Sequence, residues 1–289
     1  MLGQLVISGL LTGSIYALVA LGMTVLFRST TIVNFCHGEF FMVGAFAVYV
    51  THHGAGWSYP ASVIFAFALL FVFGMAVERG LIRPLRNAPH VALAMMTVAL
   101  SFLLKGVARF FFGRDVSSLP PLLEGEPVSF AGVVLARQDL LVIGVSLLTV
   151  GLFFLFFQRT QVGKIIQAAS QNPRGAALVG INVPRFHNVM WGASALMGAL
   201  AGVLIAPSTL VYPDMGTTAL IRAFAAMTLG GFGSLPGAVV GGLTMGIVEN
   251  LAGGYVSSSL VEITAFIVII LVLLVRPQGL LGEGKASAV

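Results

Sequence analysis

Four polar residues stand inside or beside long apolar stretches, where their side chains could act on a passing solute or ion. They are Asn34, Glu39, Arg222 and Glu249. A charged side chain in membrane hydrocarbon costs several kcal/mol, so such residues usually face a cavity, a partner side chain or the interface. We therefore take these four as candidates for a translocation path.

Each charged candidate also has a purely structural interpretation. Glu39 lies near the start of an apolar run and is expected at the interface, while Arg222 lies only a few residues into its run and can reach outward. Glu249 lies deeper, and we interpret it as a hydrogen-bonding partner of a neighbouring helix, an ion pair with Arg222 being the alternative. Lys105 and Arg109, four residues apart near the end of a run, are expected at the interface.

The sequence does not carry the common signatures of catalysis. Gly163-Lys164 is followed by Ile165 and has no upstream glycine at the distance that a P-loop requires. The five histidines show no metal-ligand spacing with cysteines or carboxylates, and no Gly-x-Ser-x-Gly elbow occurs. We expect no catalytic residue, no metal, no cofactor and no ATP site in this chain.

Composition indicates a membrane protein. Hydrophobic residues make up 58% of the 289 residues, charged residues 9%, and the mean hydropathy is +1.01. The net charge of +5 gives no reason to expect nucleic acid. At roughly 20 residues per spanning helix, we expect an all-α polytopic protein with eight or nine transmembrane helices, forming a single domain over residues 1–289. The expected spans are Leu2–Phe27, Glu39–Thr51, Pro60–Val77, Val91–Phe112, Asp139–Phe157, His187–Ala206, Ala219–Phe232, Gly237–Ala252 and Leu260–Val275.

The distribution of basic residues predicts the orientation. With nine spans, ten of the fifteen Lys and Arg residues fall on the side that carries residues 161–183, which the positive-inside rule makes cytoplasmic. The N-terminus is then outside and the C-terminus inside, provided that Ala219–Phe232 crosses rather than re-enters. The ten are Arg28, Arg79, Arg83, Arg86, Arg159, Lys164, Arg174, Arg185, Arg276 and Lys285. The longest polar connection, Arg114–Gln138, is expected outside as a hairpin or short helix.

The segment Gln161–Val183 is polar but lies between long apolar runs. Its first part predicts a surface helix, because Val162, Ile165, Ile166 and Ala169 recur at helical spacing. Pro173 should end that helix at Asn172, which then caps a second helix with Pro173 at its first position. Gly180 should stop the second helix. A rigid basic wedge on one membrane face is typical of a coupling element on which a partner pushes.

Small residues four apart predict close helix packing. The pairs are Gly9/Gly13, Gly198/Gly202, Gly237/Gly241 and Gly242/Gly246. Such spacing lets helix backbones approach closely within lipid. The same smooth surfaces could let helices slide during a transport cycle.

Three stretches resemble the membrane permeases of bacterial branched-chain amino acid ABC transporters, of the LivH type. They are Ile32–Glu39 (IVNFCHGE), Gly163-Lys164 through Asn172-Pro173 to Gly180-Ile181, and Ala223–Gly242, with Arg276–Leu280 (RPQGL) also fitting. Arg222 stands where the resemblance leads us to expect a basic residue, often lysine.

The resemblance implies an inner-membrane subunit that pairs with a second, similar permease, two cytoplasmic ATPases and a periplasmic binding protein. It implies that the ATPase receives Gly163–Ile181, which contains Gly163, Lys164, Ala168, Asn172, Pro173 and Gly180. It leaves the substrate open, since related permeases serve other amino acids, amides or urea.

Two other classes remain as alternatives on the residues alone. A secondary transporter or channel would use Glu39 and Glu249 as ion or proton sites. A structural membrane subunit would have no pathway. The three classes differ in whether ATPases co-purify with the chain and in whether an ion gradient alone drives uptake.

Overall fold

The computed structural model describes residues 1–113, 116–123, 125–130 and 133–282. Arg114 and Lys285, which enter the charge count above, lie outside these residues. The helices are α1 (Leu2–Thr30), α2 (His37–Val48), α3 (Tyr59–Val77), α4 (His90–Phe112), α5 (Arg137–Arg159), α6 (Gln161–Gln171), α7 (Pro173–Leu178), α8 (Val183–Ile205), α9 (Met215–Gly230), α10 (Leu235–Tyr255) and α11 (Leu260–Val275). The strands are β1 (Val128–Phe130) and β2 (Val133–Leu135).

The chain is an all-α polytopic membrane protein apart from this short hairpin. In the described ranges, six helices are long and apolar enough to cross a membrane, namely α1, α3 with its continuation to Leu85, α4, α5, α8 and α10. The three remaining predicted spans also correspond to helices, but shorter ones. α2 has 12 residues and continues as a π-helix over Tyr49–Gly54, while α9 and α11 have 16 residues each.

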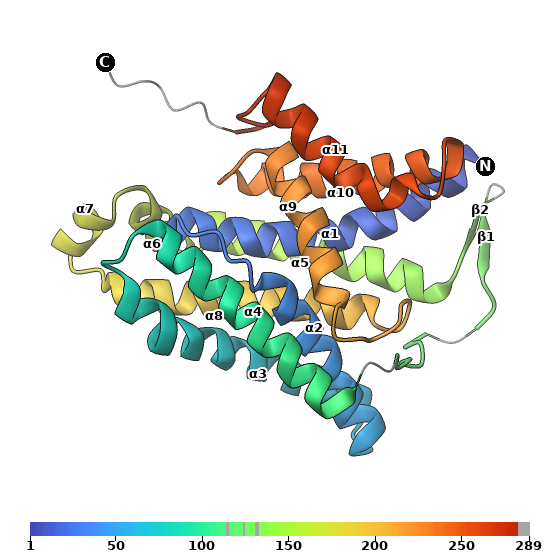
Figure 1. Cartoon of the computed structure of the whole chain (residues 1–289), viewed down its shortest axis with the longest axis horizontal. Helices are drawn as coiled ribbons and strands as arrows, with labels where there is room; N and C mark the ends of the chain where they lie inside the picture. Colours follow the sequence, from blue (N-terminus) through green and yellow to red (C-terminus); the bar gives the residue numbers. More distant parts are fainter. Residues whose placement is uncertain (114–115, 124, 131–132, 283–289) are drawn as a thin grey trace.

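α9 corresponds to the span that the sequence left uncertain. It begins beside the end of α4, where Asp214 contacts Arg109 at 2.8 Å. It ends beside the segment that follows α11, where the amides of Leu280 and Leu281 donate to the carbonyls of Leu229 and Gly230. Between these contacts α9 runs obliquely through the bundle as one uninterrupted helix (Figure 1). The start of α1 and the segment that follows α11 lie at opposite ends of the molecule (Figure 1).

α1 forms the centre of the bundle and packs along α10. A Cβ atom on Gly13 would lie 2.9 Å from Leu243 Cα, and one on Gly9 would lie 2.7 Å from Ile247 Cα. On the facing helix, a Cβ on Gly246 would meet the backbones of both Gly9 and Gly13. The expected small-residue packing is therefore confirmed, with two glycine pairs facing each other.

The connection between α4 and α5 contains the hairpin that was one of two expectations for it. β1 and β2 pair antiparallel, with Ser129 opposite Val134. The Gln4 side chain at the start of α1 donates to the carbonyl of Val134 at 2.9 Å and accepts from its amide at 3.0 Å. This double contact fixes the hairpin to the N-terminal end of α1, at the opposite end of the molecule from α6 and α7 (Figure 1).

Candidate functional site

The candidate coupling segment, residues 161–183, begins with a capped helix. The Thr160 hydroxyl accepts from the amide of Gly163 at 2.9 Å and so caps α6. A Cβ on Gly163 would collide with the carbonyl oxygens of Phe156 and Phe157, so only glycine permits the sharp entry from α5. Gln167 then donates to the carbonyl of Phe157 at 2.7 Å, which fixes α6 against the end of α5.

The second short helix has the caps that the sequence predicts. Asn172 ends α6, and its Oδ1 accepts from the amide of Gly175 at 2.8 Å, which caps α7. Pro173 is the first residue of α7, and Gly180 has a φ of 89° just after it. Asn182 is a third cap, which the sequence did not single out. Its side chain accepts from the amide of Arg185 and so caps α8, the helix that follows α7.

The apolar positions of α6 do not all face the bundle. Ile166 and Ala169 are buried, but Val162 is 53% exposed and Ile165 44% exposed. The predicted surface helix is present, with Val162 and Ile165 on its outer face and Ile166 and Ala169 on its buried face. Leu178 at the end of α7 is 89% exposed, so the segment offers apolar side chains as well as charges on its free face. Lys164 and Ala168 are exposed on α6.

Arg222 and Glu249 form an ion pair between α9 and α10. Arg222 Nη2 lies 2.8 Å from Glu249 Oε1, and the two side chains are 22% and 5% exposed. The guanidinium also lies 5.8 Å from the centre of the Tyr16 ring on α1. The interpretation that Arg222 reaches outward to the interface is therefore wrong. Because three helices meet at this pair, it links α1, α9 and α10 electrostatically.

Arg222 also lines a cavity of about 200 Å³ between α1, α2, α8 and α9. Its walls carry the apolar side chains of Ile15, Phe41 and Met215, together with the hydroxyl groups of Thr12 and Tyr16. A single cation beside an apolar wall is suited to a small molecule with one carboxylate and a hydrophobic part.

Glu39 and Asn34 belong to a second polar cluster, at the start of α2. Asn34 Oδ1 accepts from the amide of Cys36 at 3.0 Å and helps to begin the helix. Glu39 is 1% exposed, and its carboxylate lies 3.3 Å from Lys105 Nζ on α4. The interfacial position expected for Glu39 and Lys105 is therefore wrong, whereas Arg109 does lie on the surface, paired with Asp214.

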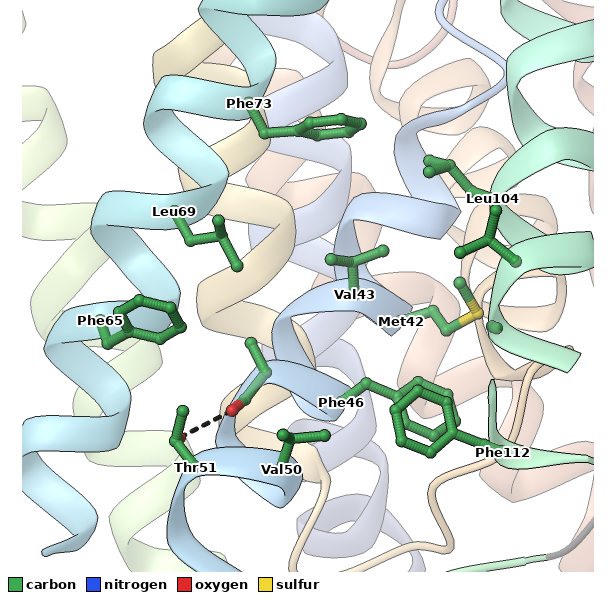
Figure 2. Close-up of a pocket in the computed structure, with 13 residues that line it drawn as sticks. Met42, Val43, Phe46, Val50, Thr51, Phe65, Leu69, Phe73, Leu104 and Phe112 are labelled. Atoms are coloured by element: carbon green, nitrogen blue, oxygen red, sulfur yellow. Dashed lines mark hydrogen bonds between the residues drawn. The ribbon is translucent and has the colours of Figure 1, made fainter. Parts of the chain in front are cut away.

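An apolar cavity of about 340 Å³ lies between α2, α3 and α4 (Figure 2). The rings of Phe46 and Phe112 stack at one side of it, with centroids 4.4 Å apart. The Thr51 hydroxyl is its polar group, and it already donates to the carbonyl of Ala47 at 2.7 Å. A zwitterion would find no unpaired partner on these walls, so we do not place a solute path there.

A further polar network, around Glu78 at the end of α3, was missed by the sequence analysis. Arg83 donates to both carboxylate oxygens, at 3.1 and 2.7 Å, and Asn188 of α8 donates to Glu78 Oε2 at 2.7 Å. Arg83 also donates to the carbonyl of Pro184. These contacts connect the end of α3 to the start of α8. α8 begins at Val183, after a connection of four residues from the end of α7. Within the described ranges, no group of three or more His, Cys, Asp or Glu residues could hold a metal ion.

Known proteins give a consistent match to this chain. The family model described as "Branched-chain amino acid transport system / permease component" matches residues 5–275. The high-affinity branched-chain amino acid transport system permease protein LivH of Escherichia coli K12 is 31% identical, over 99% of this chain and 97% of its own length. The corresponding protein BraD of Pseudomonas aeruginosa is 31% identical with the same coverage. A probable LivH of Methanocaldococcus jannaschii is 28% identical over 97% of this chain and 91% of its own length.

Among solved structures, one of a metal-chelate type ABC transporter in an inward-facing conformation is similar to this chain. The match covers 94% of this chain and 82% of the transporter chain, with a TM-score of 0.41 and 18% sequence identity. The sequence matches extend over nearly the whole length of this chain and of its relatives, and the range matched by the family model contains α6, α7 and the positions of Arg222 and Glu249. The chain therefore belongs to the family of permease components of branched-chain amino acid transport systems.

Proposed function

We propose that this chain is the membrane-spanning subunit of an ABC importer for branched-chain amino acids in the bacterial cytoplasmic membrane. Residues 1–289 would act as one permease domain, which neither binds nor hydrolyses ATP itself. Its partners would be a second permease subunit, two cytoplasmic ATPases and a periplasmic binding protein that delivers the substrate. ATP binding between the ATPases would favour one of two permease conformations, and that difference in affinity would drive alternating access.

The observation that carries this proposal is the capped wedge formed by α6 and α7. Thr160, Asn172 and Asn182 cap three consecutive helices, so the wedge is held firmly between α5 and α8. Its free face presents Ile165 and Leu178 beside the charge of Lys164. A rigid surface of this kind can transmit a push from a docked ATPase into α8, because only four residues separate α7 from α8.

The cavity beside Arg222 is the proposed place on the translocation path. The substrate carboxylate would pair with the Arg222 guanidinium, whose five N–H donors exceed what Glu249 alone can accept. The aliphatic side chain would lie against Ile15, Phe41 and Met215. Asn34 and Glu39 would contribute to the path by holding α2 in place. Asn34 accepts from the amide of Cys36 at the start of α2, and Glu39 pairs with Lys105 of α4.

Crosslinking tests the coupling proposal directly. Ala168 is exposed on α6, and Cys36, the one native cysteine, is buried, so a cysteine at Ala168 carries the reactive thiol. A crosslinker there should capture an ATPase in the assembled transporter. A cysteine at Asn87, exposed in the connection before α4, is the control on the same face. Capture from Asn87 without capture from Ala168 would refute the assignment of the coupling segment.

Reconstitution tests the substrate and the class of transporter. The chain should be placed in liposomes with the subunits encoded beside it, and uptake of leucine, isoleucine, valine, an amide and urea should be compared. ATP-dependent uptake of the three branched-chain amino acids supports the proposal, whereas preference for the amide or urea would replace the substrate. Uptake by the chain alone, driven by an ion gradient, would instead show a secondary transporter.

A further inference from the structure

A second polar cavity, of about 420 Å³, lies at the end of the molecule that carries α6 and α7. The end of α3, the start of α4 and the start of α8 enclose it. Ile82, Leu93 and Trp191 form an apolar part, while Arg83, Arg86 and His187 contribute nitrogen atoms. None of these residues belongs to the translocation cavity beside Arg222, so this is a separate site.

The charges of this cavity favour an anion. The Glu78 carboxylate is already used, because Arg83 and Asn188 both donate to it. Arg86 is exposed and forms no ion pair with any described residue. The cavity therefore keeps one uncompensated positive charge at its mouth.

Two residues that line the cavity also carry buried nitrogen atoms without a partner. Trp191 is 0% exposed, and its indole Nε1 has no hydrogen-bond partner among the described residues. His187 Nε2, also buried, is without a partner in the same part of the chain. The indole N–H can only donate, and a buried donor without an acceptor is unfavourable. A ligand oxygen would remove this deficit.

The cavity borders the surface that faces lipid. Val91 and Met95, next to His90 and Leu93 on α4, are 66% and 63% exposed. A molecule with an anionic head and an apolar tail can therefore enter from the side, with its tail along α4 and its head beside Arg86. Basic pockets between transmembrane helices on the cytoplasmic side are suited to phosphate-bearing lipid headgroups.

We propose that the cavity between α3, α4 and α8 binds the phosphate group of an anionic phospholipid. The headgroup would contact Arg86 and accept from Trp191 Nε1, and the first part of an acyl chain would lie against Ile82 and Leu93. Pro184 and His187 of the cavity belong to the first turns of α8, directly after the coupling segment. The lipid would thus contact α8, the helix that in the proposed function transmits the movement of α6 and α7. This site is independent of the identity of the transported solute.

The two tryptophans of the chain allow a direct test. Trp57 lies in the connection between α2 and α3 and is 45% exposed, so Trp57→Phe leaves Trp191 as the only indole fluorophore. The full-length Trp57→Phe protein would be reconstituted in bilayers containing phosphatidylcholine or phosphatidylglycerol with brominated acyl chains, which quench a neighbouring indole. We expect brominated phosphatidylglycerol to quench Trp191 with roughly five-fold higher apparent affinity, as one arginine–headgroup contact predicts.

Matched charge variants locate the effect. Arg86→Gln should abolish the preference for phosphatidylglycerol, whereas Arg79→Gln, an exposed arginine of the same region that does not line the cavity, should keep it. Equal quenching by the two lipids would overturn the proposal, as would a preference that survives Arg86→Gln or is lost equally in Arg79→Gln. Unbrominated phosphatidylglycerol should restore the fluorescence and inorganic phosphate should not. Restoration by inorganic phosphate would overturn the lipid as the ligand.

Discussion

Arg222 Nη2 and Glu249 Oε1 lie 2.8 Å apart across the interface between α9 and α10, in side chains that are 22% and 5% exposed. The two helices are already joined through a short connection, Gly231–Ser234. The ion pair adds a second link, about four turns from that connection on α10. It therefore limits how far α9 and α10 can separate beside the cavity that Arg222 lines.

Replacing Glu249 separates the structural role of the pair from a proton-carrying one. Glu249→Gln should keep folded yield and most ATP-driven uptake, because the amide oxygen still accepts from Arg222 at similar volume. Glu249→Leu should destabilise the protein by about 3–5 kcal/mol, since it leaves the Arg222 charge buried without a partner. Fluorescence-detected size-exclusion chromatography and thermal unfolding would measure both variants. A well-folded Glu249→Gln protein that binds its ATPases but transports nothing would contradict the structural role.

The Glu39–Lys105 pair should behave as a clasp between α2 and α4. Lys105→Met should lower the free energy of unfolding, because the Glu39 carboxylate, which is 1% exposed, would lose its partner. The double variant Glu39→Gln/Lys105→Met should recover most of the loss, which makes the coupling between the two positions roughly 1–3 kcal/mol. A double-mutant cycle on thermal stability measures this coupling. Strictly additive losses would show that the two side chains do not interact in the membrane.

Gly163 should be the most sensitive glycine of the coupling segment. Gly163→Ala places a Cβ against the carbonyls of Phe156 and Phe157, so α6 must shift away from α5. We expect ATPase co-purification and ATP-driven uptake to fall together, while the membrane helices remain folded. Gly175→Ala is the matched control on α7, because its Cβ would meet only the side chain of Asn172, at 3.0 Å or more. Equal loss in the two variants would argue against the close contact at Gly163.

Thiol labelling tests the orientation that the basic residues predict. A cysteine at Ser118, exposed beyond α4, should react with an impermeant reagent added outside intact cells. A cysteine at Gln171, exposed at the end of α6, should react only after permeabilisation. The reverse pattern would place the coupling segment outside and overturn its proposed role.

Local sequence signals predicted the two short helices of residues 161–183 well. Asn172, Pro173 and Gly180 act on backbone groups within three residues of themselves, so their roles as caps and breaks can be inferred without knowing the fold. The outer faces of Val162 and Ile165 could not be inferred, because periodicity shows that a face is apolar but not what covers it. The uncovered residues are those that a separate subunit would contact.

The polar contacts of the membrane helices were the hardest part to predict. Arg222 and Glu249 are 27 residues apart and Glu39 and Lys105 are 66 apart, so each contact depends on how whole helices are placed and rotated. The sequence showed that these residues need partners but not which ones. Glu78 was missed because it lies among arginines at the end of a span, where a charge is ordinary.

The glycine-lined contact between α1 and α10 has a consequence for biogenesis. α1 leaves the ribosome before the other described helices, yet the helix that packs against Gly9 and Gly13 begins only at Leu235. During synthesis α1 must wait in the bilayer with this narrow groove filled by lipid or by the insertion machinery. The bundle can close around α1 only after α10 has been translated, so nascent chains halted before Leu235 should be open substrates for membrane proteases.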